Sequence, residues 1–207
     1  MYRLPHFTET DLAVILEFMK KFSFATMIGA GEKPVATQIP VLISATEEGI
    51  MLKGHFMRGT DHYETLIKNP ETLFLFIGPQ CYVSASWYEE RGHGSTWNYM
   101  SVQARGKLCF YNDVQTVELL QELTHYFEDT QTRPELLENM NEAYINTNVR
   151  AIIGFETRLE NVQATFKLSQ NKDDESYRKI VENLGKSENY NEIIIAAEMK
   201  KRRNYLF

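Results

Sequence analysis

Between about residues 23 and 168 the sequence is a series of short β-rich runs separated by turn residues. The runs SFATMIGA, PVATQIPVLI and IMLKGHF are joined by the turns GEKP and TEEG, a pattern typical of an antiparallel meander. TLFLFIG, CYVSASWY and the long WNYMSVQARGKLCFY follow, and a strand pair is expected at about 150–168. The runs before this pair, around six strands with one short helical crossover, TDHYETLIKN, predict a small barrel rather than a doubly wound sheet. The expected fold class is mainly β with flanking α-helices (α+β).

Helical periodicity flanks and interrupts these runs. Apolar residues at helical spacing predict a first helix over about 9–22 and acidic helices over about 114–128 and 135–146. Two final helices are expected over about 173–184 and 190–202. Because no linker-like stretch interrupts the chain, we predict one domain over 1–207, with a barrel core at about 23–168 and C-terminal helices at about 173–203.

The net charge of −6, from 28 acidic and 22 basic residues, argues against general nucleic-acid binding. The dense basic run Lys200–Arg203 follows a helical pattern. A solvated helix end is favoured there, and a local DNA contact stays possible.

The cysteine and histidine residues bear on the cellular location of the protein and on whether it binds a metal. Cys81 and Cys109 lie in apolar, strand-like runs, so we expect two buried free thiols and a reducing, cytoplasmic location. Neither a signal-peptide pattern nor an apolar segment of membrane-spanning length is apparent, which predicts a soluble intracellular protein without membrane association. No histidine or cysteine spacing typical of a metal site is present, so no metal is expected.

Three segments could hold a ligand, and each has a structural alternative. Gly54, His55, Arg58 and Thr60 lie where a strand ends and a helix begins, which suits a phosphate, although Thr60 could be only the helix cap. The segment 87–99 presents aromatic rings and Asn98 to a planar ligand, or it is an aromatic barrel corner. Lys167, Ser169, Gln170 and Asn171 could hold an anion or a ribityl chain, or they form a strand-to-helix turn in which Asn171 or Asp173 caps the helix.

Taken together, these segments resemble the FMN-binding negative transcriptional regulator family, the PaiB-like proteins. The resemblance begins with MYRLPHF at residues 1–7 and continues through ATQIP at 36–40 and GH at 54–55 with Arg58. It extends through YVS at 82–84, SWY at 86–88 and TWNY at 96–99, and it ends with KLSQN at 167–171. Each motif is weak alone, but the order and spacing of all of them are specific.

The resemblance implies an FMN-binding split β-barrel, similar to pyridoxamine-phosphate oxidase, that forms a homodimer with FMN between the subunits. By the same resemblance, Arg58 and Thr60 would hold the phosphate, and Thr37 and Gln38 would face the isoalloxazine. Gly54 and His55 would also bind the cofactor, Thr96, Trp97, Asn98 and Gln103 would close the site, and Lys167, Ser169 and Gln170 would complete it.

The chain departs from the family pattern at four positions. Gln38 and Gln103 stand where the family commonly has histidine, and Ala85 and Ser95 stand where it commonly has proline. Losing two imidazoles removes candidate proton-transfer groups, whereas glutamine still hydrogen-bonds to flavin edge atoms.

Three functions therefore remain open. The family implies a negative transcriptional regulator, with DNA contact supplied by the basic run or by a partner protein. The alternatives are an FMN-dependent oxidoreductase of the split-barrel type and a flavin-binding sensor without catalysis. The sequence assigns no catalytic residue.

Overall fold

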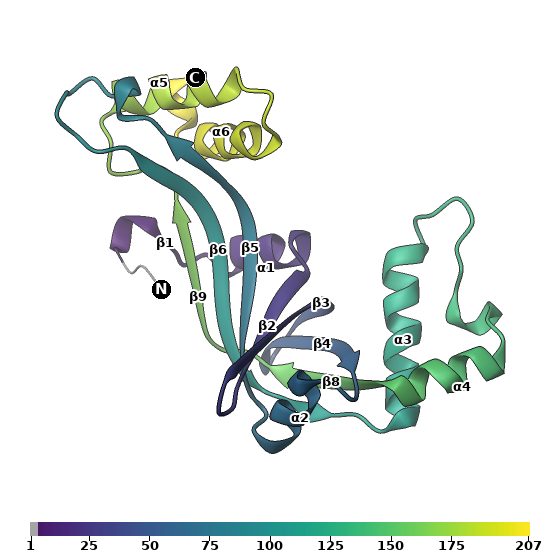
Figure 1. Ribbon diagram of the computed structural model, residues 1–207. Coiled ribbons are helices and arrows are strands. Elements are labelled where there is room, and N and C mark those ends of the chain that lie inside the picture. Colours follow the sequence, from purple (N-terminus) through teal and green to yellow (C-terminus); the bar gives the residue numbers. More distant parts are fainter. Residues whose placement is uncertain (1–3) are drawn as a thin grey trace. The chain divides into compact units, whose positions relative to one another are not determined.

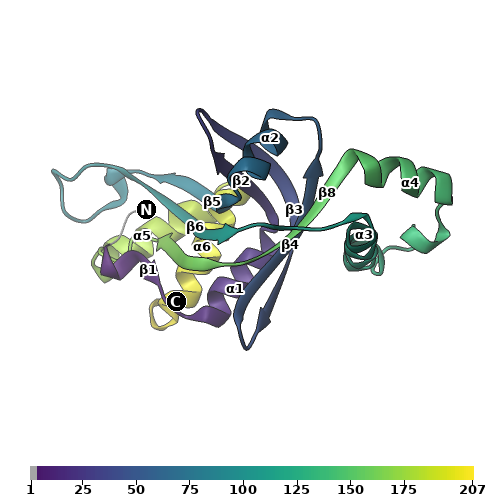
Figure 2. The same cartoon turned by 90° about the horizontal axis from the view of Figure 1, so that it is seen from below.

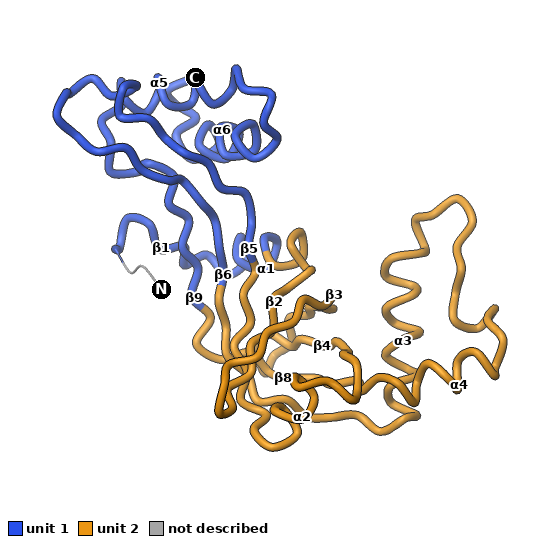
Figure 3. The backbone as a smooth tube through the Cα atoms, viewed as in Figure 1, with its two compact units in different colours: residues 1–18, 77–102, 163–207 blue, residues 19–76, 103–162 orange. Residues whose placement is uncertain are grey.

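The computed structural model describes residues 4–207, and its chain divides into two compact units. Unit 1 comprises 1–18, 77–102 and 163–207, and unit 2 comprises 19–76 and 103–162 (Figure 3). Residues 1–3, the beginning of the MYRLPHF motif, lie outside the described part. The sequence contains no signal for this division into units. The division does not decide whether residues 1–207 form one domain, so the single domain remains a prediction.

Unit 2 is built on an antiparallel meander. β2 (Phe24–Ala30) pairs with β3 (Pro34–Thr46), and β3 pairs with β4 (Gly49–Met57), as the turn pattern predicts. Gly49 closes the second hairpin with φ +128°, a conformation that favours glycine. β4 continues the sheet to β8 (Ile152–Arg158), and β8 pairs with the short β7 (Cys109–Phe110).

The core of unit 2 follows from strand alternation. In β4 every second residue from Ile50 to Phe56 is buried. The ring of Phe155 on β8 lies 5.9 Å from that of Phe56 and 6.3 Å from that of Phe74. Gly54 belongs to this core, because a Cβ on it would lie 3.1 Å from the Phe155 ring.

Three α-helices complete unit 2. α2 (Asp61–Lys68) follows β4, and α3 (Asp113–Glu128) follows β7. A short 3₁₀ turn (Leu137–Asn139) then leads to α4 (Glu142–Ala151), which runs directly into β8. Both views show α3 and α4 together beyond the end of β8 (Figures 1 and 2).

Unit 1 contains the remaining helices and the end of the sheet. β1 (Thr8–Glu9) pairs with β9 (Glu160–Lys167). α1 (Leu12–Lys21) follows β1, and most of this helix belongs to unit 1. α5 (Asp174–Gly185) and α6 (Tyr190–Arg202) pack as a helical pair. Tyr177 of α5 is fully buried and donates to the Met199 carbonyl of α6 at 2.9 Å. Short 3₁₀ turns lie at 5–7, 85–87 and 204–206.

One nine-stranded sheet has the order β1-β9-β6-β5-β2-β3-β4-β8-β7. β5 (Glu71–Val83), β6 (Thr96–Lys107) and β9 each run from one unit into the other. The sequence predicts two strands where β5 is one, because Gly78-Pro79 looks like a break. Backbone pairing continues through this dipeptide, and the buried positions change from even to odd numbers there.

Other sequence expectations need smaller corrections. The second acidic helix is α4, which begins at Glu142 instead of 135, after the 3₁₀ turn. Cys81 is a buried free thiol as expected, but Cys109 is exposed because it lies on the outer strand β7. Among residues 4–207 no helix has the length and apolarity that crossing a membrane requires.

Candidate functional site

The candidate ligand residues fall into two groups, one in each unit. Unit 2 holds Thr37, Gln38, Gly54, His55, Arg58, Thr60 and Gln103; unit 1 holds Thr96, Trp97, Asn98, Lys167, Ser169 and Gln170. Their roles in cofactor binding stay predictions, but the structure shows what each side chain contacts.

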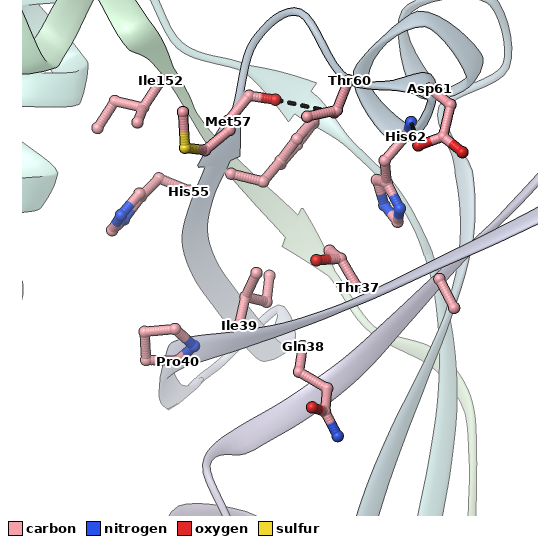
Figure 4. Close-up of a pocket in the computed structure, with 12 residues that line it drawn as sticks. Thr37, Gln38, Ile39, Pro40, His55, Met57, Thr60, Asp61, His62 and Ile152 are labelled. Atoms are coloured by element: carbon pink, nitrogen blue, oxygen red, sulfur yellow. Dashed lines mark hydrogen bonds between the residues drawn. The ribbon is translucent and has the colours of Figure 1, made fainter.

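A cleft in unit 2 brings four of the predicted residues together: Thr37, Gln38, His55 and Thr60 (Figure 4). It lies between β3, the end of β4 and the start of α2, with Ile152 at its edge, and its volume is about 430 Å³. Pockets of roughly 300–1,000 Å³ are typical of small-molecule sites. Thr37 and Gln38 extend to opposite sides of β3, as neighbours in a strand do.

Two histidines line this cleft with ring nitrogens that lack partners. Nδ1 of His55 and both ring nitrogens of His62 are buried and have no hydrogen-bond partner within residues 4–207. Burial lowers the pKa of His55. Burial also lowers the pKa of His62, against the opposing charge of Asp61, so both rings are neutral near pH 7. Unpaired buried polar atoms cost free energy and call for an explanation.

His62 is the residue that sequence reasoning missed. It is only 4% exposed, although it is the second residue of α2, and its ring lies 5.6 Å from that of Phe56. The available signal was a histidine two residues after a helix cap. Without the packing of α2 against the sheet, that position looks solvent-exposed.

The N-terminus of α2 is largely satisfied by its own side chains. Thr60 is the helix cap and accepts from the backbone N–H of Tyr63 at 3.1 Å. Asp61 accepts from the backbone N–H of His62 at 2.7 Å. The structural alternative for Thr60 is therefore present, and fewer N–H groups remain for a phosphate.

Arg58 is also engaged by neighbouring groups. Its Nε donates to the Ile152 carbonyl at 2.6 Å, and Nη1 donates to the Tyr63 hydroxyl at 3.4 Å. Nη2 lies 3.6 Å from a carboxylate oxygen of Asp113. Arg58 does not line the cleft, and neither does any other lysine or arginine of the described chain, whereas the carboxylate Asp61 does. The cleft therefore suits an uncharged polar ligand surface better than a phosphate.

In unit 1, Lys167 fastens the end of β9 to the start of β6. Its Nζ donates to the Thr96 hydroxyl and, at 3.0 Å, to the Trp97 carbonyl. Burial lowers the pKa of Lys167. The Trp97 side chain is 54% exposed and meets Tyr82 edge-on, with 6.1 Å between ring centroids. This aromatic pair offers flat surface to a ligand or partner.

Asn98, Ser169 and Gln170 form hydrogen bonds inside unit 1. The Ser169 hydroxyl, at a residue with φ +60°, donates to Asn98 Oδ1 at 3.0 Å, and both side chains are buried. The Gln170 amide donates to the Phe166 carbonyl and accepts from the Leu168 N–H. This is the strand-to-helix turn that the sequence left open as the alternative.

The remaining two candidates lie elsewhere in unit 2. Gly54 is a core position, as described above. Gln103 is half-buried in β6 and does not line the cleft.

Comparison with protein families gives a match over most of the chain. The sequence model of the family described as "Putative FMN-binding domain" matches residues 1–161. The chain is 30% identical over 192 residues to "Protease synthase and sporulation protein PAI 2" of Bacillus subtilis, covering 92% of each chain. An uncharacterized protein of Emericella nidulans is 24% identical, with 82% of this chain and 84% of that protein covered.

Solved structures show the same fold at low sequence identity. The flavocytochrome Anf3 from Azotobacter vinelandii has a TM-score of 0.59 at 10% identity, with 80% of this chain and 72% of that chain covered. The FAD and heme binding protein from Mycobacterium smegmatis has a TM-score of 0.55 at 15% identity, with 78% and 73% covered. The expected α+β fold of the split-barrel type is thereby confirmed.

Proposed function

The chain belongs to the family described as "Putative FMN-binding domain", and we therefore propose that it binds FMN, with the cleft of unit 2 as part of the site. The observation that carries the proposal is the set of three buried ring nitrogens without partners, on His55 and His62, at a cleft of suitable size. A flavin has carbonyl and N–H groups along its ring edge, which are the partners that neutral imidazoles need.

The residues of the cleft suit the uncharged parts of a flavin. Thr37 offers a hydroxyl group, and Ile39 and Met57 offer apolar surface. The Thr60 hydroxyl already accepts from the Tyr63 N–H and donates to the Met57 carbonyl. The Gln38 side chain extends to the other side of β3 from Thr37.

Arg58, which lies between the cleft residues His55 and Thr60 in the sequence, is the candidate for binding the phosphate. To reach a phosphate it would have to give up part of its contacts with Ile152 and Asp113. When bound, FMN would supply the redox chemistry, and this chain would bind and orient it.

For the biological role, we propose negative transcriptional regulation, on the ground of the resemblance to the PaiB-like proteins. DNA contact through a partner is favoured over contact through the basic run, because Arg202 and Arg203 are held inside unit 1. Arg202 binds Glu9 and Glu198, and Arg203 binds the carbonyls of Gln170 and Lys172.

A homodimer completes the proposal. Phe24 on β2 and Met57 on β4 expose 63% and 58% of their surface, as apolar side chains at an interface between subunits do in the isolated chain.

The absorption spectrum of the purified protein tests flavin binding. We expect a visible flavin band after FMN is added and the excess removed by gel filtration, and quenching of FMN fluorescence on titration. A protein that stays colourless and leaves FMN fluorescence unchanged would contradict the proposal.

A further inference from the structure

We propose that His62 hydrogen-bonds an uncharged polar group of the flavin, so that it is a ligand residue of the cleft and not a phosphate contact. This inference rests on the proposed flavin binding. Figure 4 shows the His62 ring extending from the start of α2 toward β3, on the side where Thr37 lies.

The imidazole of His62 is buried without hydrogen-bond partners in the described chain. The side chain is 4% exposed, yet neither ring nitrogen has a hydrogen-bond partner within residues 4–207. An imidazole that serves only to fill space is disfavoured here, because an apolar side chain of similar volume would fill it without burying unpaired polar atoms. The unpaired nitrogens therefore point to a partner that arrives with a ligand.

A ring nitrogen of His62 reaches the ligand by rotation of the ring. The ring lines the cleft but its nitrogens are closed from solvent, so it must turn about its side-chain bonds. The torsion of the Cβ–ring bond is intrinsically broad for histidine, and this ring has to rotate about it when the ligand binds. A neutral imidazole then donates from one nitrogen and accepts at the other.

The charge of the surroundings selects the group that is recognised. Asp61 lies beside His62 and lines the cleft, while no lysine or arginine of the described chain does. A doubly negative phosphate would be repelled by Asp61 and would find no cation there. A carbonyl or N–H edge of the isoalloxazine ring, or a ribityl hydroxyl, carries no such penalty.

The test compares His62→Leu with wild type for both riboflavin and FMN, by quenching of flavin fluorescence. We expect the affinity for each flavin to fall about tenfold, and equally, because the contact does not involve the phosphate. The melting temperature of the ligand-free variant should be unchanged or higher, since the unpaired nitrogens are gone. The control His125→Leu, at a partly exposed position of α3 that does not line the cleft, should leave both affinities unchanged.

A folded His62→Leu variant that keeps both affinities overturns the inference, and so does a loss confined to FMN. ¹⁵N NMR of the histidine rings in wild type gives a second measurement that needs no variant. Adding riboflavin should shift a ring nitrogen of His62, and an unchanged spectrum with riboflavin bound overturns the inference alone. If wild type binds neither flavin, the proposed function fails with it, so the two failures are distinguishable.

Discussion

At the scale of single residues, the polar side chains of unit 2 differ in whether the protein already satisfies them. Thr60 and Arg58 have partners among neighbouring backbone and side-chain groups. His55 and His62 have buried ring nitrogens that lack a hydrogen-bond partner in the described chain. A sequence pattern predicts the same ligand-binding role for every polar residue near a strand end. Only the contacts distinguish polar groups that the protein itself satisfies from buried polar groups that lack a partner.

We predict that Arg58→Ala lowers the free energy of unfolding by about 1–2 kcal/mol, because the Ile152 carbonyl loses its 2.6 Å donor. Urea denaturation measures this change, with the exposed Arg133→Ala as control. If Arg58 also reaches the phosphate, its removal weakens FMN binding about ten- to a hundredfold more than riboflavin binding. An equal loss for both flavins would leave Arg58 a structural residue only.

At the scale of elements, one histidine of α3 contacts two carboxylates, and one of these belongs to the 3₁₀ turn that follows the helix. Nδ1 of His125 lies 2.9 Å from Asp129, and Nε2 lies 3.0 Å from Glu138. The hydrogen bond to Asp129 and the charges of Asp129 and Glu138 raise the pKa of His125 above its ordinary value of 6.5.

This arrangement makes the contact between α3 and the turn pH-dependent. A raised pKa in the folded chain means that the stabilisation is complete below pH 6.5 and disappears as pH rises through the raised value. We expect amide exchange at 130–140, corrected for intrinsic rates, to be slower at pH 6 than at pH 9. His125→Gln should remove the difference, and a difference that persists in this variant would disprove the assignment.

Arg203, at the C-terminal end of α6, contacts α5 and the turn that precedes it. The Arg203 guanidinium lies 4.3 Å from the centre of the Tyr177 ring, and it donates to Gln170, Lys172 and Asp174. The basic run lies at a helix end as expected, but its second half is not solvated, because Arg202 and Arg203 are half-buried and bonded to other elements of unit 1.

We therefore expect truncation after Met199 to lower the melting temperature by several degrees, in keeping with the loss of one or more kcal/mol. The double substitution Lys200→Gln and Lys201→Gln should leave the melting temperature nearly unchanged and is the appropriate test of DNA contact. If this double variant abolishes a DNA mobility shift that the wild type produces, the basic run is a DNA contact after all.

At the scale of the whole molecule, the negative charge is concentrated in one segment. Residues 113–151 contain eight acidic and two basic residues, a net charge of −6, which equals that of the whole chain. The remainder has 20 of each sign. The unfavourable field for a polyanion is therefore local to the α3–α4 segment and does not extend evenly over the barrel.

If two copies share the flavin site, affinity depends on assembly. We predict that FMN affinity falls when the protein is diluted below the dissociation constant of the dimer. Sedimentation velocity followed at the flavin absorbance measures the mass of the flavin-loaded species. A flavin-loaded species at the monomer mass of 24.1 kDa would refute a shared site.

The sequence by itself determined the α+β class, the β2-β3-β4 meander and most helices, because alternation, turn residues and caps are local signals. Asn112 and Asp173, for example, cap α3 and α5. The tertiary structure alone decided that β5 passes through Gly78-Pro79, that Cys109 is exposed and that Asn98 and Ser169 are buried against each other. It also revealed His62. Burial and hydrogen-bond partners arise from segments distant in the chain, so no local pattern contains them.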